Sequence, residues 1–274
     1  MADVGLNEAT QIGSREFHFQ TSTLVDEGVI RTEVFEKGQV LFVMNHQYER
    51  RSPSQTAAQF RDSLLQGMER ASAAANIRHV RVCVVDEAVS AAEPYRIVSD
   101  DNPPDGVVTL WIDSYLQRDD FEQQLAKCVS GYSAYLVWES EPLVNTEHIA
   151  DPGQRTHGMN EIVFLRRPRH LSEAEWIAIW HDSHTQVAID TQSTFGYRQN
   201  VVIRALTADA KPQDAIIEEN FPAAAISSRQ AFYDAAGDEA TYRSREKIMV
   251  ESCARFIDFD DMDCLPMSEY IIKR

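Results

Sequence analysis

Positive charge is scarce in this sequence, which has 26 Lys and Arg residues against 43 Asp and Glu and a formal net charge of -17. A chain with that balance is repelled by the phosphate backbone of nucleic acid and by an anionic membrane surface. We therefore expect neither nucleic acid nor a membrane among its partners. A small molecule that is neutral, or that is guided by local charges, fits the composition better.

Cysteine is also rare, and its four copies lie far apart and form no C-x-x-C motif. This spacing argues against a zinc knuckle and against a disulfide scaffold, and it makes a reducing cytoplasm the expected location. No run of eighteen apolar residues occurs, and the N-terminal stretch has no cationic start followed by an apolar segment. We therefore expect neither a membrane span nor an export signal. The G-x-S-x-G, G-x-G-x-x-G and Walker A motifs are missing, which removes those hydrolase and nucleotide-binding families.

What the chain does contain is one order of elements that occurs twice. After an N-terminal extension over residues 1–37, a first half at 38–141 is expected as strand, helix, strand, strand, helix, strand. A polar stretch at 142–158 holds Pro and Gly and shows no hydrophobic period, which predicts a linker. The second half, at 159–274, repeats the order of the first.

Each element is expected from its own hydrophobic period. The S-x-x-E spacing of Ser172 and Glu175 adds a capping box at the start of one helix. Strands are predicted at 40–47, 79–86, 107–113, 134–140, 160–168, 196–207, 215–225 and 266–274. Helices are predicted at 52–75, 121–129 and 171–192, with a broken helical stretch at 227–258 that is interrupted at Gly237.

A unit of this order is the ferredoxin-like arrangement, in which a four-stranded antiparallel sheet carries both helices on one face. The other face of the sheet is apolar, and two units can bury these faces against each other. The expected fold class is therefore α+β, with tandem ferredoxin-like repeats that close a barrel within one chain. Two independent domains on a flexible tether would expose two apolar sheet faces, which makes that alternative the weaker one.

The stretch WHDSH at 180–184 carries two of the eight histidines. On the predicted helix, His181 and His184 share one face with Trp176 and Trp180, and this face is directed toward the sheet. A histidine in a mostly apolar pocket can exchange protons near neutral pH. The pair is therefore a candidate for acid/base catalysis.

Two other interpretations of this histidine pair stay open. A metal site needs three or four ligands, and the local sequence has neither H-E-x-x-H nor a nearby Cys or Asp at ligand spacing, so we expect no metal. Each imidazole could instead bond a neighbouring backbone or carboxylate group and serve packing alone. Two imidazolium charges three residues apart would repel, so we expect at most one charged ring.

Three stretches of the second half occur in one order: VFLRRPRHLSEAEWIAIWHDSHTQVAID, FGYRQNVV and ESCARFIDFD. Together they resemble an EthD-type domain of the dimeric α+β barrel superfamily. The helix signature of an aromatic residue, three intervening residues and a histidine is matched by Trp180 and His184, whereas His181 lies outside it. The resemblance covers residues 158–274 and implies an intrachain dimeric α+β barrel. The first half is then a degenerate repeat without a histidine on its first helix, so one site is expected.

That resemblance implies chemistry on small aromatic or polyketide-like molecules, in some members without a cofactor and in others with haem. We expect a cofactor-independent lyase that acts by dehydration or by a retro-aldol-type elimination, with haem as the minor alternative. A monooxygenase of the same superfamily is the first alternative. A non-catalytic binding or accessory protein in xenobiotic or aromatic degradation is the second. A homodimer stays open.

The expected site combines helix and strand residues of the second half. The expected catalytic residues are His184 as general acid/base, His181 and Tyr197. The expected substrate-binding residues are Trp176, Trp180, Asn200 and Arg166. Sheet packing is an equal alternative for Tyr197, and a solvated loop is an alternative for the basic stretch RRPRH that contains Arg166.

Overall fold

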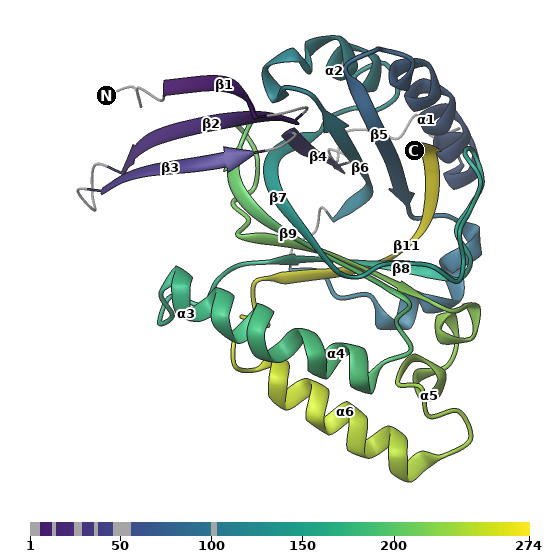
Figure 1. Ribbon diagram of the computed structural model, residues 1–274. Helices are drawn as coiled ribbons and strands as arrows, with labels where there is room; N and C mark the ends of the chain where they lie inside the picture. The colour runs from purple at the N-terminus through teal and green to yellow at the C-terminus, as the bar shows by residue number, and fades with distance from the viewer. Residues whose placement is uncertain (1–5, 13–14, 25–28, 36–37, 46–55, 100–102) are drawn as a thin grey trace.

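Figure 1 shows the computed structural model of the protein. The backbone is described for residues 6–12, 15–24, 29–35, 38–45, 56–99 and 103–274, and the side chains are described within the last two of these ranges. The first half contains β4 (Gly38–Asn45), α1 (Ala57–Ser72), β5 (Ile77–Val84), η1 (Glu87–Tyr95), β6 (Pro104–Ile112), η2 (Tyr115–Gln117), α2 (Asp119–Leu125) and β7 (Ser133–Leu143).

The second half repeats this order with longer helices. It contains β8 (Met159–Leu165), α3 (Glu173–Ile177), η3 (Ala178–His184), α4 (Thr185–Thr191), β9 (Gly196–Ala205), β10 (Ala215–Phe221), η4 (Ala223–Ile226), α5 (Arg229–Phe232), α6 (Glu239–Cys253) and β11 (Met262–Lys273). Every strand and helix predicted from the hydrophobic period is present. The short helical turns η1, η2 and η4 are additional.

Eight strands close one barrel in the order β10-β8-β11-β5-β6-β4-β7-β9, and all neighbouring pairs are antiparallel. The halves join in a symmetric way, because the last strand of each half pairs with the second strand of the other. These two seams are β11 with β5 and β7 with β9. The predicted tandem ferredoxin-like barrel is therefore confirmed, and it has no open edge at either seam.

The helices lie outside the barrel. In Figure 1, α1 and α2 cover the sheet of the first half, and α3, α4 and α6 cover the sheet of the second. Leu64 and Met68 of α1 pack on Val80 and Val82 of β5 in one outer core. The outer core of the second half is larger and holds the fully buried Trp180. Burial of this apolar area is the main force that holds each helix on its sheet.

The inside of the barrel is divided along its axis. Side chains of a strand alternate between its two faces, so every second residue points inward. At one end the inward side chains are apolar, among them Ile162, Phe164, Leu265 and Met267. At the other end they are charged or amide side chains from the same strands, so the barrel has a dry end and a polar end.

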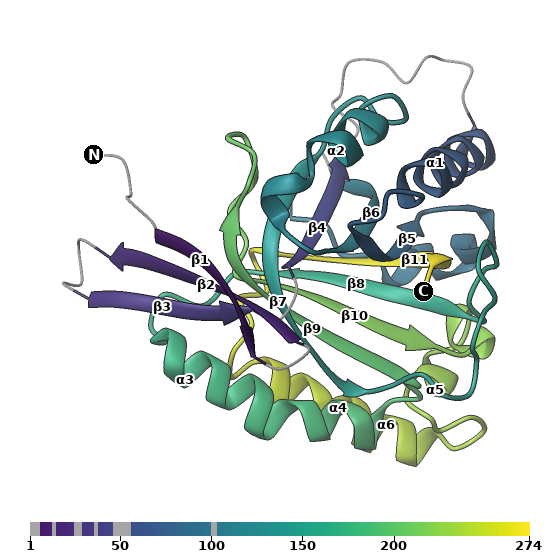
Figure 2. The same ribbon diagram turned by 45° about the horizontal axis from the view of Figure 1, so that its top comes forward.

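The N-terminal extension contains a sheet of its own. The strands β1 (Leu6–Ile12), β2 (Arg15–Leu24) and β3 (Val29–Phe35) form an antiparallel meander beside the barrel (Figures 1 and 2). The sequence did not predict these strands. The four cysteines of the chain are free thiols. Among the described helices, none combines the length and the apolar character needed to cross a membrane.

Candidate functional site

The predicted helix at 171–192 is continuous, but its middle is a π-helix. It begins at the predicted capping box of Ser172 and Glu175, which is present. Within the π segment the Thr185 backbone N–H donates to the Trp180 carbonyl five residues earlier, and the Thr185 hydroxyl donates to the same oxygen at 2.9 Å. Wide turns of this kind are frequent at functional sites. His181 and His184 both lie in this wide turn, between Trp180 and Thr185, and their rings have different surroundings.

His184 is buried between the helix and α6. Its Nδ1 lies 3.0 Å from Ser252 Oγ, and its ring packs on Phe256 with 4.5 Å between ring centroids. Burial, with a smaller contribution from Arg255, lowers the pKa of His184 to about 4. The imidazole is therefore neutral at pH 7, and its hydrogen bond ties the π segment to α6.

The two tryptophans and the tyrosine predicted for the site lie in the same buried layer. Trp180 Nε1 donates to the Tyr197 hydroxyl at 3.0 Å, and Trp176 Nε1 donates to the Phe256 carbonyl at 2.9 Å. Each of these three side chains is at most 1% exposed. Burial also raises the pKa of Tyr197 far above its ordinary value. These contacts are those of a packed core.

His181 lies at the wall of a groove between the helix and the strands β7 and β9. The groove has a volume of about 670 Å³. The His181 ring is half-buried and meets the Trp180 ring edge-on at 4.7 Å. Its Nε2 has no hydrogen-bond partner among the described residues. The groove is lined by Trp138, Ser140, Glu173, Ala174, Ile177, Ala178, His181, Asp182 and Val201.

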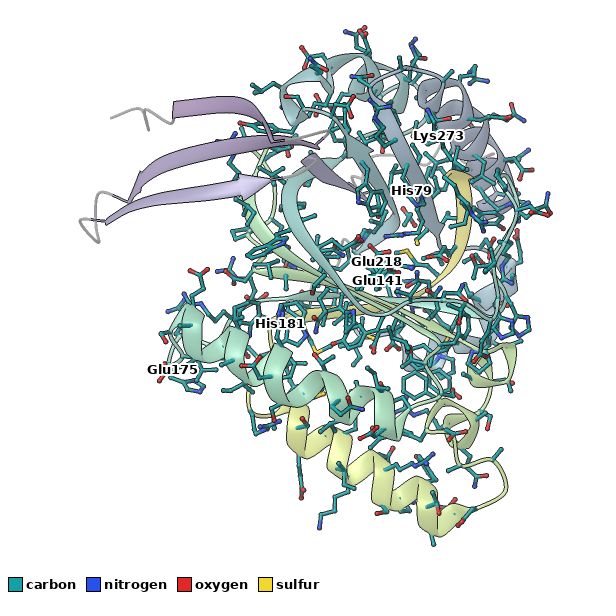
Figure 3. All side chains as sticks on the ribbon, viewed as in Figure 1. His79, Glu141, Glu175, His181, Glu218 and Lys273 are labelled. Carbon is teal, nitrogen blue, oxygen red and sulfur yellow. The ribbon has the colours of Figure 1, made fainter. Side chains whose placement is uncertain are left out.

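The electrostatics of the groove favour a neutral imidazole. Burial lowers the pKa of His181, and the nearby carboxylate of Asp182 opposes that shift. Trp138 is 65% exposed and offers an aromatic surface to a molecule in the groove. Figure 3 shows His181 on the helix side of the second sheet, whereas Glu218 and Glu141 lie within the barrel. The groove can therefore hold an apolar or aromatic compound beside the His181 ring.

The structure separates one of the predicted binding residues, Asn200, from the histidines. Asn200 points into the barrel, where its amide nitrogen donates to the Ile216 carbonyl at 3.0 Å and to Glu218 at 3.2 Å. Tyr197 and Asn200 are an odd number of residues apart on β9, so they lie on opposite faces of the sheet. Arg166 forms an ion pair with Asp214 at 3.2 Å. One site that contains both Asn200 and the histidines is thus ruled out by this geometry.

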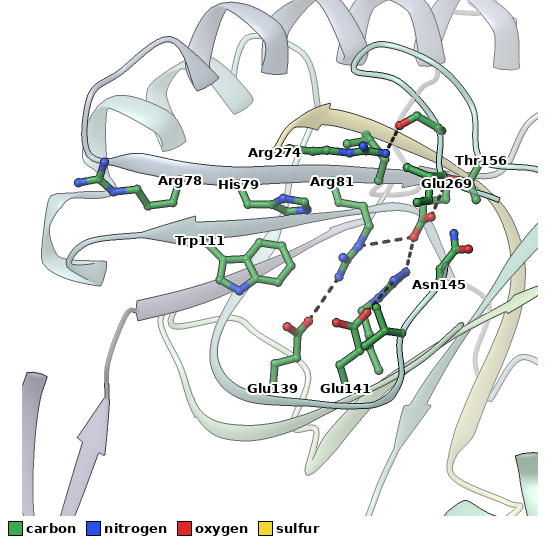
Figure 4. Close-up of a pocket in the computed structure, with 15 residues that line it drawn as sticks. Arg78, His79, Arg81, Trp111, Glu139, Glu141, Asn145, Thr156, Glu269 and Arg274 are labelled. Carbon is green, nitrogen blue, oxygen red and sulfur yellow. Dashed lines mark hydrogen bonds and ion pairs between the residues drawn. The ribbon is translucent and has the colours of Figure 1, made fainter. Parts of the chain in front are cut away.

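The polar end of the barrel holds a second cavity, of about 540 Å³, which the sequence did not predict (Figure 4). Its floor is built by Arg81, Arg198 and Glu269, each at most 6% exposed in its side chain. The linker covers part of it through Asn145 and Ile149. The sequence does contain a sign of this cavity, because charged residues such as these interrupt strands that are otherwise mainly apolar.

The floor is an ion network. Arg81 Nε lies 3.0 Å from Glu218, and Arg198 contacts both Glu269 and the Asn220 amide oxygen. Although burial opposes it, Arg198 and Arg81 hold the pKa of Glu269 below its ordinary value. Buried ionic groups persist only when they are paired, and the described contacts meet that condition.

Two of these carboxylates also lie near a thiol. Ligand atoms of Cys83, Glu218 and Glu269 fall within 4.8 Å of one another. Both carboxylates already bind guanidinium groups, and a divalent cation there would be repelled by Arg81 and Arg198. The prediction that this chain uses no metal stays a prediction.

Comparison with known proteins is informative about the fold alone. No family model matches the sequence, and no curated protein matches it. The solved structure of an anthrone oxidase-like protein matches 87% of this chain and 94% of its own, with a TM-score of 0.51 and 10% sequence identity. This likeness agrees with the barrel described above.

Two further solved structures align over similar lengths. A protein of Fusobacterium nucleatum subsp. nucleatum, provisionally named a monooxygenase, covers 86% of this chain and 92% of its own at 8% identity and a TM-score of 0.45. A protein provisionally named a chlorite dismutase covers 86% of this chain and 95% of its own at 13% identity and a TM-score of 0.42. These lower scores add nothing to the description of the fold.

Proposed function

We propose that this protein is a small-molecule enzyme that performs proton transfer on an aromatic or polyketide-like compound bound in the groove beside His181. The observation that carries the proposal is the His181 ring at the wall of a 670 Å³ groove, with a nitrogen that lacks a hydrogen-bond partner among the described residues. A concave apolar site with a titratable group of shifted pKa is the usual form of a small-molecule site.

Three described histidines line one of the two cavities or belong to the predicted site: His79, His181 and His184. Of these, His181 is the best suited to transfer protons. A catalytic acid or base works best when its pKa lies near the working pH. The pKa values of His79 and His184 are lowered to about 3 and about 4, so both are weak bases. His184 is also held by Ser252. We therefore assign the acid/base role to His181 rather than to His184.

The other residues that were predicted for the site would hold the His181 ring in place. We propose that Trp180 and Tyr197, which are bonded to each other, and His184, which is bonded to Ser252, fix the π segment so that the His181 ring faces the groove. The aromatic-histidine signature of an EthD-type domain would then act through positioning. Trp138 takes the role of the aromatic wall that was predicted for the buried tryptophans.

Dehydration is the reaction that one imidazole can serve most simply. In a β-hydroxy ketone, His181 would remove a proton from the carbon next to the carbonyl. The electron pair of that C–H bond forms the C=C bond, and the C–O bond to the hydroxyl breaks. The imidazolium then returns the proton to the departing hydroxide, so that water leaves and the enzyme is restored.

An oxidation is the second candidate, because a solved structure with a similar fold, at a TM-score of 0.51, is described as anthrone oxidase-like. The first step would be the same proton removal. The resulting carbanion would then react with dioxygen, which is the co-reactant, and form a C–O bond instead of expelling a hydroxide. The imidazolium returns its proton to give a hydroperoxide, and loss of water from this hydroperoxide leaves a C=O bond. If a compound binds but no product is formed, a binding or accessory protein is favoured instead.

A screen separates these candidates. Phenols, aromatic ketones and aromatic β-hydroxy ketones are incubated with the full chain in air and under nitrogen, and products are identified by mass spectrometry. Loss of water in both atmospheres supports the lyase, and turnover in air alone supports the oxidase. An absorption spectrum after addition of haem tests the haem-dependent branch.

The variant His181→Ala should lower turnover about a hundredfold or more. His170→Ala removes an exposed histidine near the start of the same helix and serves as the matched control. Equal turnover of the His181→Ala variant and the unmodified chain would contradict the proposal.

A further inference from the structure

We propose that the cavity at the polar end of the barrel binds a small zwitterion, which is a molecule that carries both a protonated amine and a carboxylate, such as a free α-amino acid. This cavity lies inside the barrel, and His181 is on the other side of the second sheet (Figures 3 and 4). The inference therefore does not depend on the proposed reaction.

The cavity has walls of opposite charge. Arg81 of β5 and Arg274 at the end of the chain stand on one side, and Glu139 and Glu141 of β7 stand on the other (Figure 4). In the barrel, β5 and β7 are separated by β6 and β4, so these charges face each other across the space. A ligand with one charge of each sign matches this arrangement.

Two ion pairs of the cavity wall are long. Arg81 is 3.5 Å from Glu139, and Arg198 is 3.7 Å from Glu141. By contrast, Arg81 is 3.0 Å from Glu218 in the floor. Charge-assisted hydrogen bonds normally measure about 2.7–2.9 Å. The floor therefore fixes the guanidinium groups, and the Glu141 carboxylate at the rim is in place to take a closer contact with an ammonium group.

The remaining wall is aromatic and uncharged. The rings of His79 and Trp111 meet edge-on with centroids 4.4 Å apart, and both line the cavity. His79 Nε2 is buried and has no hydrogen-bond partner among the described residues. Ile149 of the linker adds an apolar surface at the mouth. This surface fits the side chain of an amino acid, whose ammonium and carboxylate groups would lie toward Glu141 and the arginines.

Ligands with a single charge fit less well. A simple amine would place its charge near the glutamates but would offer nothing to Arg81 and Arg274. A simple carboxylate would meet the arginines but would be repelled by Glu139 and Glu141. The cost of removing water from a charge in this cavity is offset only when the charge finds a partner. The zwitterion satisfies both walls at once.

The test uses the full chain and the twenty standard amino acids, added one at a time, with binding measured by isothermal titration calorimetry. At least one amino acid should bind with a saturable isotherm. For each binder, the methyl ester lacks the carboxylate and the N-acetyl form lacks the ammonium charge. Each blocked form should bind at least about tenfold more weakly, because it loses one charge-assisted contact.

Two glutamate variants locate the ligand. Glu141→Gln should weaken binding about tenfold or more, whereas Glu147→Gln, an exposed position of the same linker region that does not line the cavity, should leave it unchanged. Circular dichroism checks that both variants are folded. The proposal is overturned if no amino acid binds, if an ester or acetylated form binds as tightly, or if Glu141→Gln binds normally.

The same titration with His181→Ala keeps this proposal distinct from the proposed function. Binding of the amino acid should be unchanged in that variant, whatever its turnover. Loss of amino-acid binding in His181→Ala would place the ligand in the groove instead and would overturn the inference.

Discussion

Glu161 of β8 and Glu219 of β10 lie directly opposite each other, and both are buried on the helix-facing side of the second sheet. Burial, together with the charge of Glu161, raises the pKa of Glu219 to about 8. Burial also raises the pKa of Glu161. Two carboxylates in this position cannot both ionise without strong repulsion, so the pair keeps a proton at neutral pH.

The stability of the protein should therefore fall as the pH rises through this region. A carboxyl group whose pKa is raised in the folded state binds more protons there than in the unfolded chain, so the free energy of unfolding decreases between about 4.5 and about 8. Glu219→Gln reduces this dependence, because only Glu161 of the pair can then titrate. At pH 8 the variant should be more stable than the unmodified chain by on the order of 2 kcal/mol.

Urea unfolding at pH 5 and at pH 8 measures this difference. Glu251→Gln, at an exposed position on α6, is the matched control and should follow the unmodified chain. If the Glu219→Gln variant shows the same loss of stability with pH as the unmodified chain, the shared proton is not present.

Removing one guanidinium from the barrel floor should be strongly destabilising. Arg81→Met leaves the buried Glu218 with less compensation, and loss of one partner of a buried ion pair typically costs about 3–5 kcal/mol. Arg78→Met breaks the exposed pair with Asp113, which should cost much less because water screens that pair. Chemical unfolding of the two variants side by side gives the comparison. Equal losses would mean that the floor network does not contribute as described.

The bond between Trp180 and Tyr197 should contribute to stability. Tyr197→Phe removes the acceptor and leaves the buried Trp180 Nε1–H without its partner, which should cost about 1–3 kcal/mol. A double-mutant cycle with Trp180→Phe isolates the pairwise contribution, and a coupling of about 1 kcal/mol is expected. A coupling near zero would contradict the supporting role that we propose for this pair.

The fold could be predicted from the sequence because its signal is local and occurs twice. Alternating strands and amphipathic helices appear in the same order in both halves, and the uncovered sheet faces have one economical way to be buried. The meander at β1–β3 was not predicted, because the polar composition of those residues carries little periodic signal. The closing seams follow from the need to leave no open edge.

The candidate site was predicted only in part. The spacing of His181 and His184 was interpreted with an α-helical period, but the π segment changes the face that each ring occupies. The hydrophobic period predicts the strand around Arg81 but not where the Arg81 side chain finds its partner, so the barrel cavity was not predicted. A charged residue within such a strand is itself a signal, since it must find a partner across the barrel, and Glu218 is 137 residues away in the sequence. No local pattern connects positions so far apart.

The central claim is that the groove beside His181, and not the buried position of His184, receives the small molecule. The most direct test is an NMR titration of histidine-labelled protein with the tightest aromatic binder from the screen, with resonances assigned through His181→Gln and His184→Gln. The imidazole resonances of His181 should shift in a saturable way while those of His184 stay in place. Shifts at His184 with His181 unmoved would contradict the claim.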